Sequence, residues 1–313
     1  MKKALVTGGA GFIGSNLTRR LIADGYTVDV LDNFSTGKQA WVPPQAGWYH
    51  WDLRYTPPKE LASKLSPDTV VFHLQGLADV RNGPDNLGAD LSQNVYSTHN
   101  LLEACRLAKV KKFVFSSSAV VYGEPDVIPT PESYAGIQTS IYGAHKLAAE
   151  AEIQAYAHYF GMQWLIFRFV SFLGAYYHHG VIWDFVKSLR KDPTKLAILG
   201  DGQQTKSYLH VQDGISGIFL ALESGKSGIF NLGHDESMKV DTIADLVIGL
   251  FAEKAAKVYV GGKRGWVGDS PVVRLDTSKI KKLGWEPIMG IQEAVLKTAA
   301  GIYALNPWKI NET

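Results

Sequence analysis

The stretch Thr7-Gly8-Gly9-Ala10-Gly11-Phe12-Ile13-Gly14 decides how the first half of this chain folds. It follows an apolar run, Ala4-Leu5-Val6, and it precedes residues 12–22, in which apolar side chains recur at helical spacing. This order predicts a strand, a glycine turn and a helix, which is the context that a dinucleotide-binding turn requires. Three of the glycines have the spacing that permits a tight turn, a close approach of the backbone to a pyrophosphate, and close helix packing. The helix N-terminus then faces the phosphates.

The carboxylates that follow indicate which dinucleotide is bound. A second apolar run, 28–31, ends at Asp32, about 20 residues after the turn, where a carboxylate accepts hydrogen bonds from the ribose hydroxyls of adenosine. Because a carboxylate repels a 2′-phosphate and no arginine lies between Arg20 and Arg54, the sequence favours NAD over NADP. Asp52 is a candidate for the adenine edge, and an ordinary loop carboxylate explains the same pattern equally well.

Size and charge exclude several classes of function. With 313 residues, 46% of them hydrophobic, the chain is expected to bury a large core in one extended domain or two unequal ones. The formal net charge is +2, and lysine and arginine are dispersed rather than clustered. This distribution favours neither nucleic-acid binding nor a polybasic membrane contact. No uninterrupted apolar run approaches the ~18 residues that span a bilayer. We therefore expect no nucleic-acid partner and no membrane partner.

The N-terminus and the cysteine content predict a cytoplasmic protein. The opening Met1-Lys2-Lys3 resembles the start of a signal peptide, but the apolar residues after it are broken by four glycines and followed by Arg19-Arg20. We interpret this segment as the first buried strand. The single cysteine, Cys105, lacks an intramolecular disulfide partner, which agrees with a reducing compartment. Its apolar neighbours predict a packed core thiol.

Apolar runs alternate with helical patterns through the first half of the chain, which predicts a parallel sheet in a doubly wound α/β fold. The runs 70–72 and 113–115 are continuously apolar, as expected of strands that helices cover on both faces. The expected strands are residues 4–7, 28–32, 69–74, 112–116 and 164–169. The expected helices are residues 12–24, 91–108 and 142–160.

The sequence predicts two interleaved parts. Residues 1–170 form the expected dinucleotide-binding domain, and residues 171–313 form most of a substrate-binding domain with shorter elements and glycine-rich joints. The helical pattern 211–223 and the strand-like 229–231 indicate that a segment of about 207–235 returns to the first sheet. We find no internal repeat and no low-complexity tract.

The second informative stretch is Tyr142-Gly143-Ala144-His145-Lys146. On a helix, Tyr142 and Lys146 are four positions apart and share a face, so an ammonium lies near the phenol. We expect the positive charge to lower the pKa of Tyr142 toward neutrality, which suits a general base that takes a proton from a sugar hydroxyl. Residues 116–123 begin with three serines at the carboxyl end of an expected central strand, where ligands of open α/β sheets bind. Ser118 is therefore the expected hydrogen-bond partner of the reacting oxygen.

Together these stretches resemble the extended short-chain dehydrogenase/reductases with a Rossmann fold, and within them the UDP-glucose 4-epimerases and related nucleotide-sugar epimerases. The resemblance spans nearly the whole chain. It rests on residues 7–14, Asp32-Asn33, Asn94-Val95, Asn100-Leu101-Leu102, residues 116–123, residues 142–146 and Gly200-Asp201-Gly202.

The resemblance implies an NAD-dependent isomerase that inverts C4 of a UDP-hexose through a transient 4-keto sugar. The implied catalytic residues are Ser118, Tyr142 and Lys146. The implied cofactor-binding residues are Gly8, Gly11, Phe12, Ile13, Gly14, Asp32, Asn33, Ser35, Thr36, Gly37, Asp52, Leu53, Leu74, Gln75, Gly76, Asn94, Ser116, Tyr142, Lys146 and Phe169. The implied substrate-binding residues are Ala78, Ser118, Tyr142, Ser171, Ala197, Lys206, Arg264, Asp269 and Arg274. No metal is expected.

Related activities fit the sequence less well. Sugar-nucleotide 4,6-dehydratases carry an acidic pair where this chain has Ala119 and Val120, and decarboxylating relatives carry a glutamate at the second position. Epimerase-reductases of the GDP-fucose synthase type use a pocket cysteine and histidine, and Cys105 lies in the wrong segment. His178 and His179 fall near the expected pocket, where roles in loop packing are favoured over catalysis.

The substrate stays open between UDP-glucose, UDP-glucuronate and a UDP-N-acetylhexosamine. Typical glucose epimerases have asparagine where this chain has Ser171, and a small hydroxyl resembles the uronate-handling members. Val273 replaces a bulky tyrosine that restricts some epimerases to unsubstituted hexoses. Lys206 stands where many relatives present an arginine to the diphosphate, and it lacks the bidentate fork of arginine.

Two further expectations complete the hypothesis. The resemblance implies a homodimer through the helices at 91–108 and 142–160. An alternative of another class is a redox sensor or scaffold that binds NAD without turnover. The Ser118, Tyr142 and Lys146 set argues against it, because a protein that only binds NAD has no use for an activated phenol.

Overall fold

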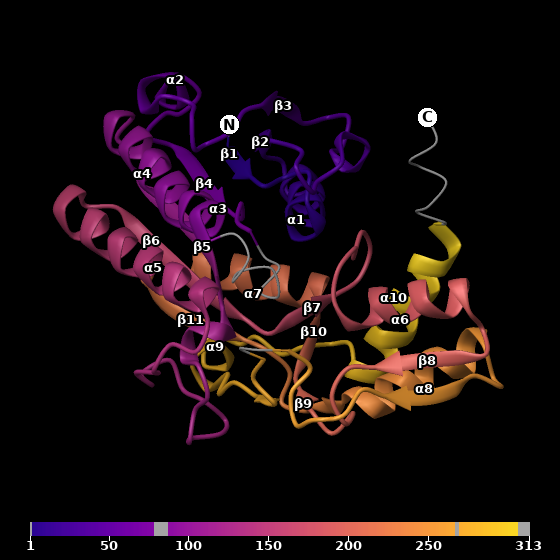
Figure 1. Ribbon diagram of the computed structural model, residues 1–313. Helices are drawn as coiled ribbons and strands as arrows, with labels where there is room; N and C mark the ends of the chain where they lie inside the picture. The colour runs from indigo at the N-terminus through magenta and orange to yellow at the C-terminus, as the bar shows by residue number, and fades with distance from the viewer. Residues whose placement is uncertain (1, 78–86, 267–268, 306–313) are drawn as a thin grey trace.

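The computed structural model describes residues 2–77, 87–266 and 269–305. Its centre is a seven-stranded sheet in the order β11-β6-β5-β4-β1-β2-β3, with every neighbouring pair parallel (Figure 1). The strands are β1 (Lys3–Thr7), β2 (Thr27–Asp32), β3 (Gly47–His50), β4 (Thr69–His73), β5 (Lys112–Ser118), β6 (Gln163–Phe169) and β11 (Gly228–Leu232). The predicted parallel, doubly wound fold is confirmed.

Alternate residues of the central strands enter two separate apolar cores. Val70 and Phe72 pack in one core and Val71 packs in the other. Leu5 is likewise separated from its neighbours Ala4 and Val6. This is why these strands are continuously apolar, since each face of a parallel sheet is covered by helices.

Two groups of helices cover the two faces. One core includes side chains of α1 (Phe12–Ala23) and α7 (Val211–Glu223). The other includes side chains of α2 (Pro58–Ala62), α4 (Ser97–Leu107) and α5 (Ile141–Phe160). The buried thiol of Cys105 lies in this second core, as its apolar neighbours predict.

The helix expected over residues 91–108 differs from the prediction. It is divided into α3 (Leu87–Leu91), a π-helical segment η3 (Ser92–Tyr96) and α4. Asn94 lies in the π-helical segment and is 1% exposed. A π-helical turn inserts one residue per turn relative to an α-helix, and apolar periodicity does not reveal it.

The C-terminal part is built of smaller sheets and helices. Its sheets pair β7 (Ser171–Leu173) with β10 (Tyr208–His210), β8 (Lys195–Ile198) with β13 (Ala256–Tyr259), and β9 (Thr205–Lys206) with β12 (Met238–Lys239) and β14 (Val272–Val273). Its helices are α6 (Val181–Lys191), α8 (Val240–Phe251), α9 (Ser278–Lys281) and α10 (Ile291–Leu305). Side chains of α7 pack in one core of the first sheet, and β11 pairs with β6.

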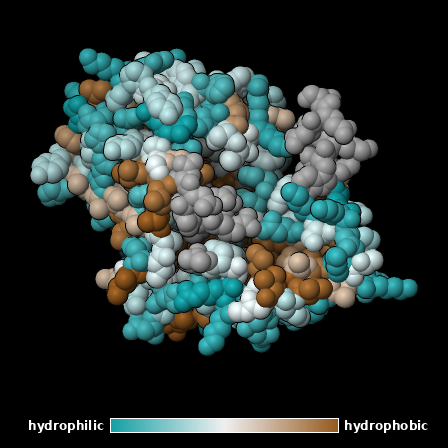
Figure 2. All heavy atoms as spheres, in the orientation of Figure 1, coloured by the Kyte–Doolittle hydropathy of each residue, from teal (hydrophilic) through white to brown (hydrophobic). Residues whose placement is uncertain are grey.

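Among the described residues, none of the helices combines the length and the apolar character needed to cross a membrane. Hydrophobic residues on the face shown in Figure 2 form separate patches among hydrophilic ones.

Candidate active site

The predicted cofactor residues collect at one edge of the sheet. They lie at or after the carboxyl ends of six strands, β1 to β6, or on the helices that follow, as a ligand site of an open α/β sheet requires. After β1 lie Gly8 and Gly11 in the turn and Phe12, Ile13 and Gly14 at the start of α1; after β2 lie Asn33, Ser35, Thr36 and Gly37; after β3 lie Asp52 and Leu53; after β4 lie Leu74, Gln75 and Gly76. Asp32 and Phe169 end β2 and β6, and Ser116 and Ser118 lie in the last three residues of β5.

The glycine turn brings the start of α1 against β1. A Cβ atom on Gly14 would lie 2.1 Å from the carbonyl oxygen of Gly8, so no larger residue fits this contact. Gly11 precedes the helix without a side-chain cap, and its amide donates to the Gly8 oxygen at 3.1 Å. The N-terminus of α1 therefore presents backbone N–H groups and a positive dipole end to an anionic group.

Asp32 is held in place by the turn itself. Its carboxylate accepts from the backbone N–H of Ala10 at 2.9 Å and of Phe34 at 2.8 Å. Burial raises the pKa of Asp32, and these two hydrogen bonds oppose the rise. The carboxylate lies between the end of β2 and the glycine turn, where the sequence places a ribose.

Asp52 is already engaged by protein groups. Arg54 contacts it through Nε and Nη2, with the shortest distance 2.6 Å, and the Asn33 amide donates to it at 3.0 Å. The guanidinium bond lowers the pKa of Asp52 to about 2. This arrangement favours the simpler interpretation of Asp52 as a structural loop carboxylate over a contact to adenine.

Tyr142 and Lys146 project from the first two turns of α5 toward the end of β5. Ser140 caps this helix by accepting from the Gly143 amide at 3.1 Å. Tyr142 is 8% exposed and Lys146 is 3% exposed. The Lys146 ammonium donates to the Ser116 carbonyl oxygen at 3.0 Å, and Ser118 makes a hydrogen bond with Tyr142. The three predicted catalytic residues are thus brought together.

The expected lowering of the Tyr142 pKa is wrong for this structure. Burial is the largest influence and raises the pKa of Tyr142, the charge of Asp90 raises it further, and the hydrogen bond with Ser118 lowers it. The Lys146 nitrogen lies 5.9 Å from the centre of the tyrosine ring. Burial also lowers the pKa of Lys146 to about 8. Desolvation disfavours the charged form of both groups, and spacing on a helix does not reveal it.

The residues around Lys146 fit a bound dinucleotide. A Cβ atom on Gly76 would lie 2.7 Å from Asn94 Oδ1 and 3.1 Å from Lys146 Nζ, so only glycine leaves this space open. Asn94 Oδ1 and Gln75 Oε1 are buried and have no hydrogen-bond partner among the described residues. Unpaired buried acceptors are costly, and hydroxyl groups of a ligand would satisfy them.

His73 underlies this space and is fully buried. It bonds Thr7 Oγ1 at 2.7 Å and Thr98 Oγ1 at 2.9 Å. Burial and the charge of Lys146 lower its pKa to about 3, so the imidazole is neutral. It connects β1, β4 and α4 beneath the site.

The predicted diphosphate-binding cations are paired with carboxylates. Lys206 bonds Asp269 and lies 4.8 Å from the centre of the Trp266 ring. Arg264 bonds Glu124, with Nη2 at 2.9 Å from Oε2. These pairs bring β9, the segment after β13 and the segment after β5 together, and an anionic ligand would compete for both cations.

Three of the other predicted substrate-binding residues are exposed to solvent. Ser171 and Arg274 are exposed, and Ala197 lies exposed on β8. Ala78 lies outside the described residues. His178 donates to the Tyr176 carbonyl at 3.0 Å and contacts the Trp41 ring, and His179 stacks on Tyr177. The favoured role of these histidines in loop packing agrees with these contacts.

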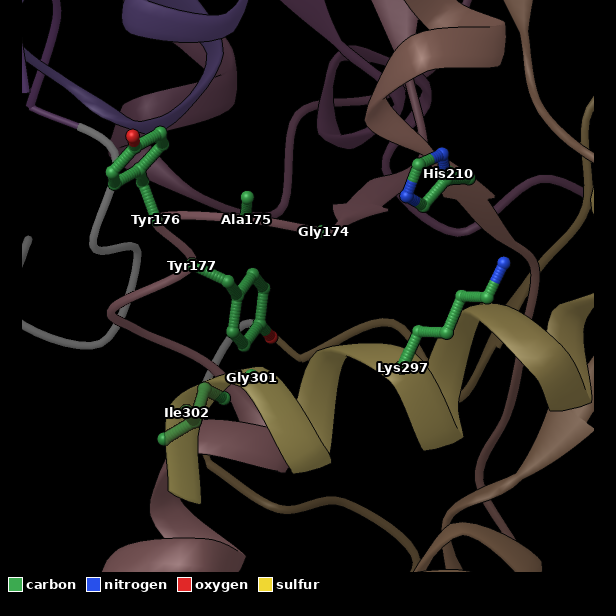
Figure 3. Close-up of a pocket in the computed structure, with 8 residues that line it drawn as sticks. All are labelled: Gly174, Ala175, Tyr176, Tyr177, His210, Lys297, Gly301 and Ile302. Carbon is green, nitrogen blue, oxygen red and sulfur yellow. The ribbon is translucent and has the colours of Figure 1, made fainter. Parts of the chain in front are cut away.

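A separate cavity of about 260 Å³ lies between the loop after β7 and α10. Figure 3 shows the Lys297 side chain extending from α10 toward His210. None of the predicted site residues lines this cavity, which is bounded by Gly174, Ala175, Tyr176, Tyr177, His210, Lys297, Gly301 and Ile302.

Sequence analysis missed two buried carboxylates near the site. Asp90 accepts from His145 Nδ1 at 2.5 Å, and Glu150 binds Arg168 at 2.7 Å and Ser117 at 2.5 Å. Asp90 and His145 are 55 positions apart. In the sequence, the one signal that could have pointed to Asp90 was His145, a titratable residue between Tyr142 and Lys146 that needs a partner.

Comparison with known proteins places this geometry in context. Residues 4–233 match the model of the NAD dependent epimerase/dehydratase family. A putative UDP-glucose 4-epimerase of Methanocaldococcus jannaschii is 33% identical over 298 residues, 93% of this chain and 95% of the relative. A crystal structure of UDP-galactose 4-epimerase has a TM-score of 0.88 and 35% identity, covering 97% of this chain and 99% of that one.

A third comparison concerns a different substrate. The UDP-glucuronic acid 4-epimerase of Bacillus cereus, solved in complex with UDP-glucuronic acid and NAD, has a TM-score of 0.87 and 26% identity. The match covers 97% of this chain and 99% of that chain. Similar folds thus act on different nucleotide sugars.

Replacing Asp32 by asparagine tests its expected part in NAD binding. The substitution replaces one of the two acceptor oxygens for the ribose hydroxyls by an NH2 donor and removes the charge that repels a 2′-phosphate. We expect NAD affinity to fall about tenfold, equivalent to about 1.4 kcal/mol, and the preference for NAD over NADP to narrow. Titration calorimetry with both dinucleotides measures this. Asp29→Asn on the same strand is the control, and equal affinities for wild type and Asp32→Asn would contradict the assignment.

Proposed function

This chain belongs to the NAD dependent epimerase/dehydratase family, and we propose that it is a UDP-hexose 4-epimerase that interconverts UDP-glucose and UDP-galactose. Its cofactor is NAD. The observation that carries the proposal is the meeting of Ser118, Tyr142 and Lys146 at the carboxyl end of the central strands, beside the glycine turn and the open space at Gly76.

In the proposed reaction Tyr142 exchanges a proton with the C4 oxygen of the sugar. When bound, NAD would supply a positive charge beside the phenol and would take a hydride from C4, the hydrogen with its two electrons, and return it. Ser118 already bonds the phenol and lies within the same cluster, so its hydroxyl is suited to hold the C4 oxygen. Lys146 has one bond to the Ser116 carbonyl and two further N–H groups that can bind ribose hydroxyls. Inversion would follow when the keto sugar has turned in the site and the hydride returns to the other face of C4.

The surroundings of Ser118 support simple inversion. Ala119 and Val120 follow it in a 3₁₀ turn, η4 (Ala119–Tyr122), and neither side chain can move a proton at C5. A dehydratase needs an acid and a base in addition to the tyrosine. Inversion at C4 needs only the residues that the site brings together, because the same tyrosine can accept and return the proton.

The remaining predicted cofactor residues belong to the same proposal. Asp32 would bind the adenosine ribose, the N-terminus of α1 would face the pyrophosphate, and Asn94 and Gln75 would meet the nicotinamide ribose or amide. Lys206, Arg264, Asp269 and Arg274 would contact the nucleotide of the substrate. A sensor or scaffold that only binds NAD would gain nothing from a buried phenol and amine.

UDP-glucuronate is the second candidate substrate. Its support is the exposed hydroxyl of Ser171 at the start of β7, two residues after Phe169, and the similarity to a uronate epimerase. Such a hydroxyl can donate a hydrogen bond to a sugar carboxylate. A UDP-N-acetylhexosamine is the third candidate substrate. Its support is Val273, which is smaller than the tyrosine that restricts some epimerases to unsubstituted hexoses and would leave room for an N-acetyl group.

The activity is tested by incubating the NAD-loaded protein separately with UDP-glucose, UDP-glucuronate and UDP-N-acetylglucosamine, and by following the sugar protons by NMR. We expect signals of the C4 epimer to appear in the UDP-glucose sample. If only the UDP-glucuronate or only the UDP-N-acetylglucosamine sample reacts, that sugar nucleotide is the substrate in place of UDP-glucose. Tight NAD binding without inversion of any sugar, while a known epimerase reacts, would contradict the proposal and favour a non-catalytic binder.

We also propose that the protein forms a homodimer through α4 and α5. These helices lie side by side in Figure 1, and the left of Figure 2, where they lie, shows hydrophobic residues on the surface. Exposed apolar side chains on these helices, and on α3 and η3 directly before α4, are Leu91, Tyr96, Leu107, Ile141, Leu147, Tyr159 and Phe160.

Light scattering coupled to size exclusion tests the dimer. We expect a mass of twice 34.4 kDa at micromolar concentration. Leu147→Glu should give a monomer, because a charge placed in an apolar interface is desolvated without a partner. Ile288→Glu, at a residue 92% exposed and outside these helices, is the control. A monomeric wild type would remove this proposal.

A further inference from the structure

Asp90 is a fully buried carboxylate beside the proposed redox site. It lies on α3 and is 0% exposed. Its Oδ1 atom accepts from His145 Nδ1 at 2.5 Å and from Asn94 Nδ2 at 3.1 Å. Its Oδ2 atom is buried and has no hydrogen-bond partner among the described residues. A buried carboxylate is costly unless it is paired and hydrogen-bonded, and here one oxygen has both donors while the other has none among the described residues.

The two donors to Asp90 come from the two elements that carry the site. His145 lies on α5 between Tyr142 and Lys146 in the chain, so its anchoring fixes the turn that carries both. Asn94 turns its other amide atom, Oδ1, toward the space at Gly76, where Lys146 Nζ also lies. One carboxylate therefore connects α3, η3 and α5.

Among the described residues, the charged and titratable groups around Lys146 come from three elements. On α5 they are Tyr142 and Glu150, on β4 the neutral His73, and on α3 Asp90, all of which interact electrostatically with Lys146 or with one another. Glu150 is committed to Arg168 on β6 and to Ser117. In the described part of the chain no arginine or lysine bonds Asp90, and His145 is its hydrogen-bond partner on α5.

The charge of Asp90 acts in the same direction on both catalytic groups. It raises the pKa of Lys146, whose burial alone lowers it, and it raises the pKa of Tyr142. A negative charge stabilises the ammonium and destabilises the phenolate.

We propose that Asp90 is a positioning residue of the redox site, which ties α3 and η3 to α5 through His145 and Asn94 and holds a negative charge beside the helix turn that carries Tyr142 and Lys146. This inference rests on the proposed function of these two residues. It adds a group that touches neither substrate nor cofactor and acts through two residues that do.

Asp90→Asn removes the charge and keeps the shape and the acceptor for His145. Both pKa values should then fall. The pH dependence of kcat in the NAD-loaded protein should therefore move to lower pH by about one unit, while the KM for the nucleotide sugar stays near that of wild type. A purely structural role would lower kcat and leave its pH dependence in place.

A second readout needs neither substrate nor turnover. The ¹³Cε resonance of Lys146 in lysine-labelled protein, assigned by its absence in Lys146→Arg, reports protonation of the amine. Its titration midpoint should lie at lower pH in Asp90→Asn than in wild type. The control is Glu152→Gln. Glu152 is a carboxylate on α5 that bonds His99 on α4 at 2.6 Å, and its replacement should leave the midpoint unchanged.

An unchanged Lys146 midpoint in folded Asp90→Asn would overturn the inference, whatever the substrate proves to be. If circular dichroism shows that this variant does not fold, His145→Ala replaces it. That change removes one of the two donors to the carboxylate and leaves its charge less neutralised, so the midpoint should move to higher pH, and no movement would overturn the inference. A protein with the expected midpoints but no epimerisation would instead contradict the proposed function alone.

Discussion

The site depends on one buried hydrogen bond, from the Lys146 ammonium to the carbonyl oxygen of Ser116 at the end of β5. An ammonium that is 3% exposed has lost most of its hydration, and this loss opposes the charged form. The bond fixes α5 against the central strand, and the charges of Asp90 and Glu150 offset part of the desolvation. Tyr142, one turn earlier on the helix, is thereby placed beside Ser118.

The parallel sheet supplies the rest of the geometry. Because neighbouring strands run in the same direction, the glycine turn after β1, Asp32 at the end of β2, Gly76 after β4 and Ser118 at the end of β5 meet at one edge. A dinucleotide laid along this edge reaches from the N-terminus of α1 to Lys146. The smaller C-terminal sheets bring Lys206 and Arg264 to the same region, where each is already bound to a carboxylate.

Local stretches of sequence predicted most of this site, because the glycine turn, the Tyr142 and Lys146 spacing and the serines after β5 each lie within a few residues. The parts that were missed depend on tertiary packing. Asp90 meets His145 across 55 positions and Arg264 meets Glu124 across 140, and no periodicity encodes either pair. The π-helical segment interrupts an expected helix without changing its apolar residues. The direction of the Tyr142 pKa was wrong because burial outweighs a nearby charge.

The central claim is that the Tyr142 phenol carries the proton to and from the sugar. Its most direct test is Tyr142→Phe, loaded with NAD and compared with wild type for binding and for conversion of UDP-glucose. We expect the affinity for the nucleotide sugar to be retained and the rate to fall about a thousandfold or more, because no group remains to accept the proton. Conversion at the wild-type rate would contradict the account.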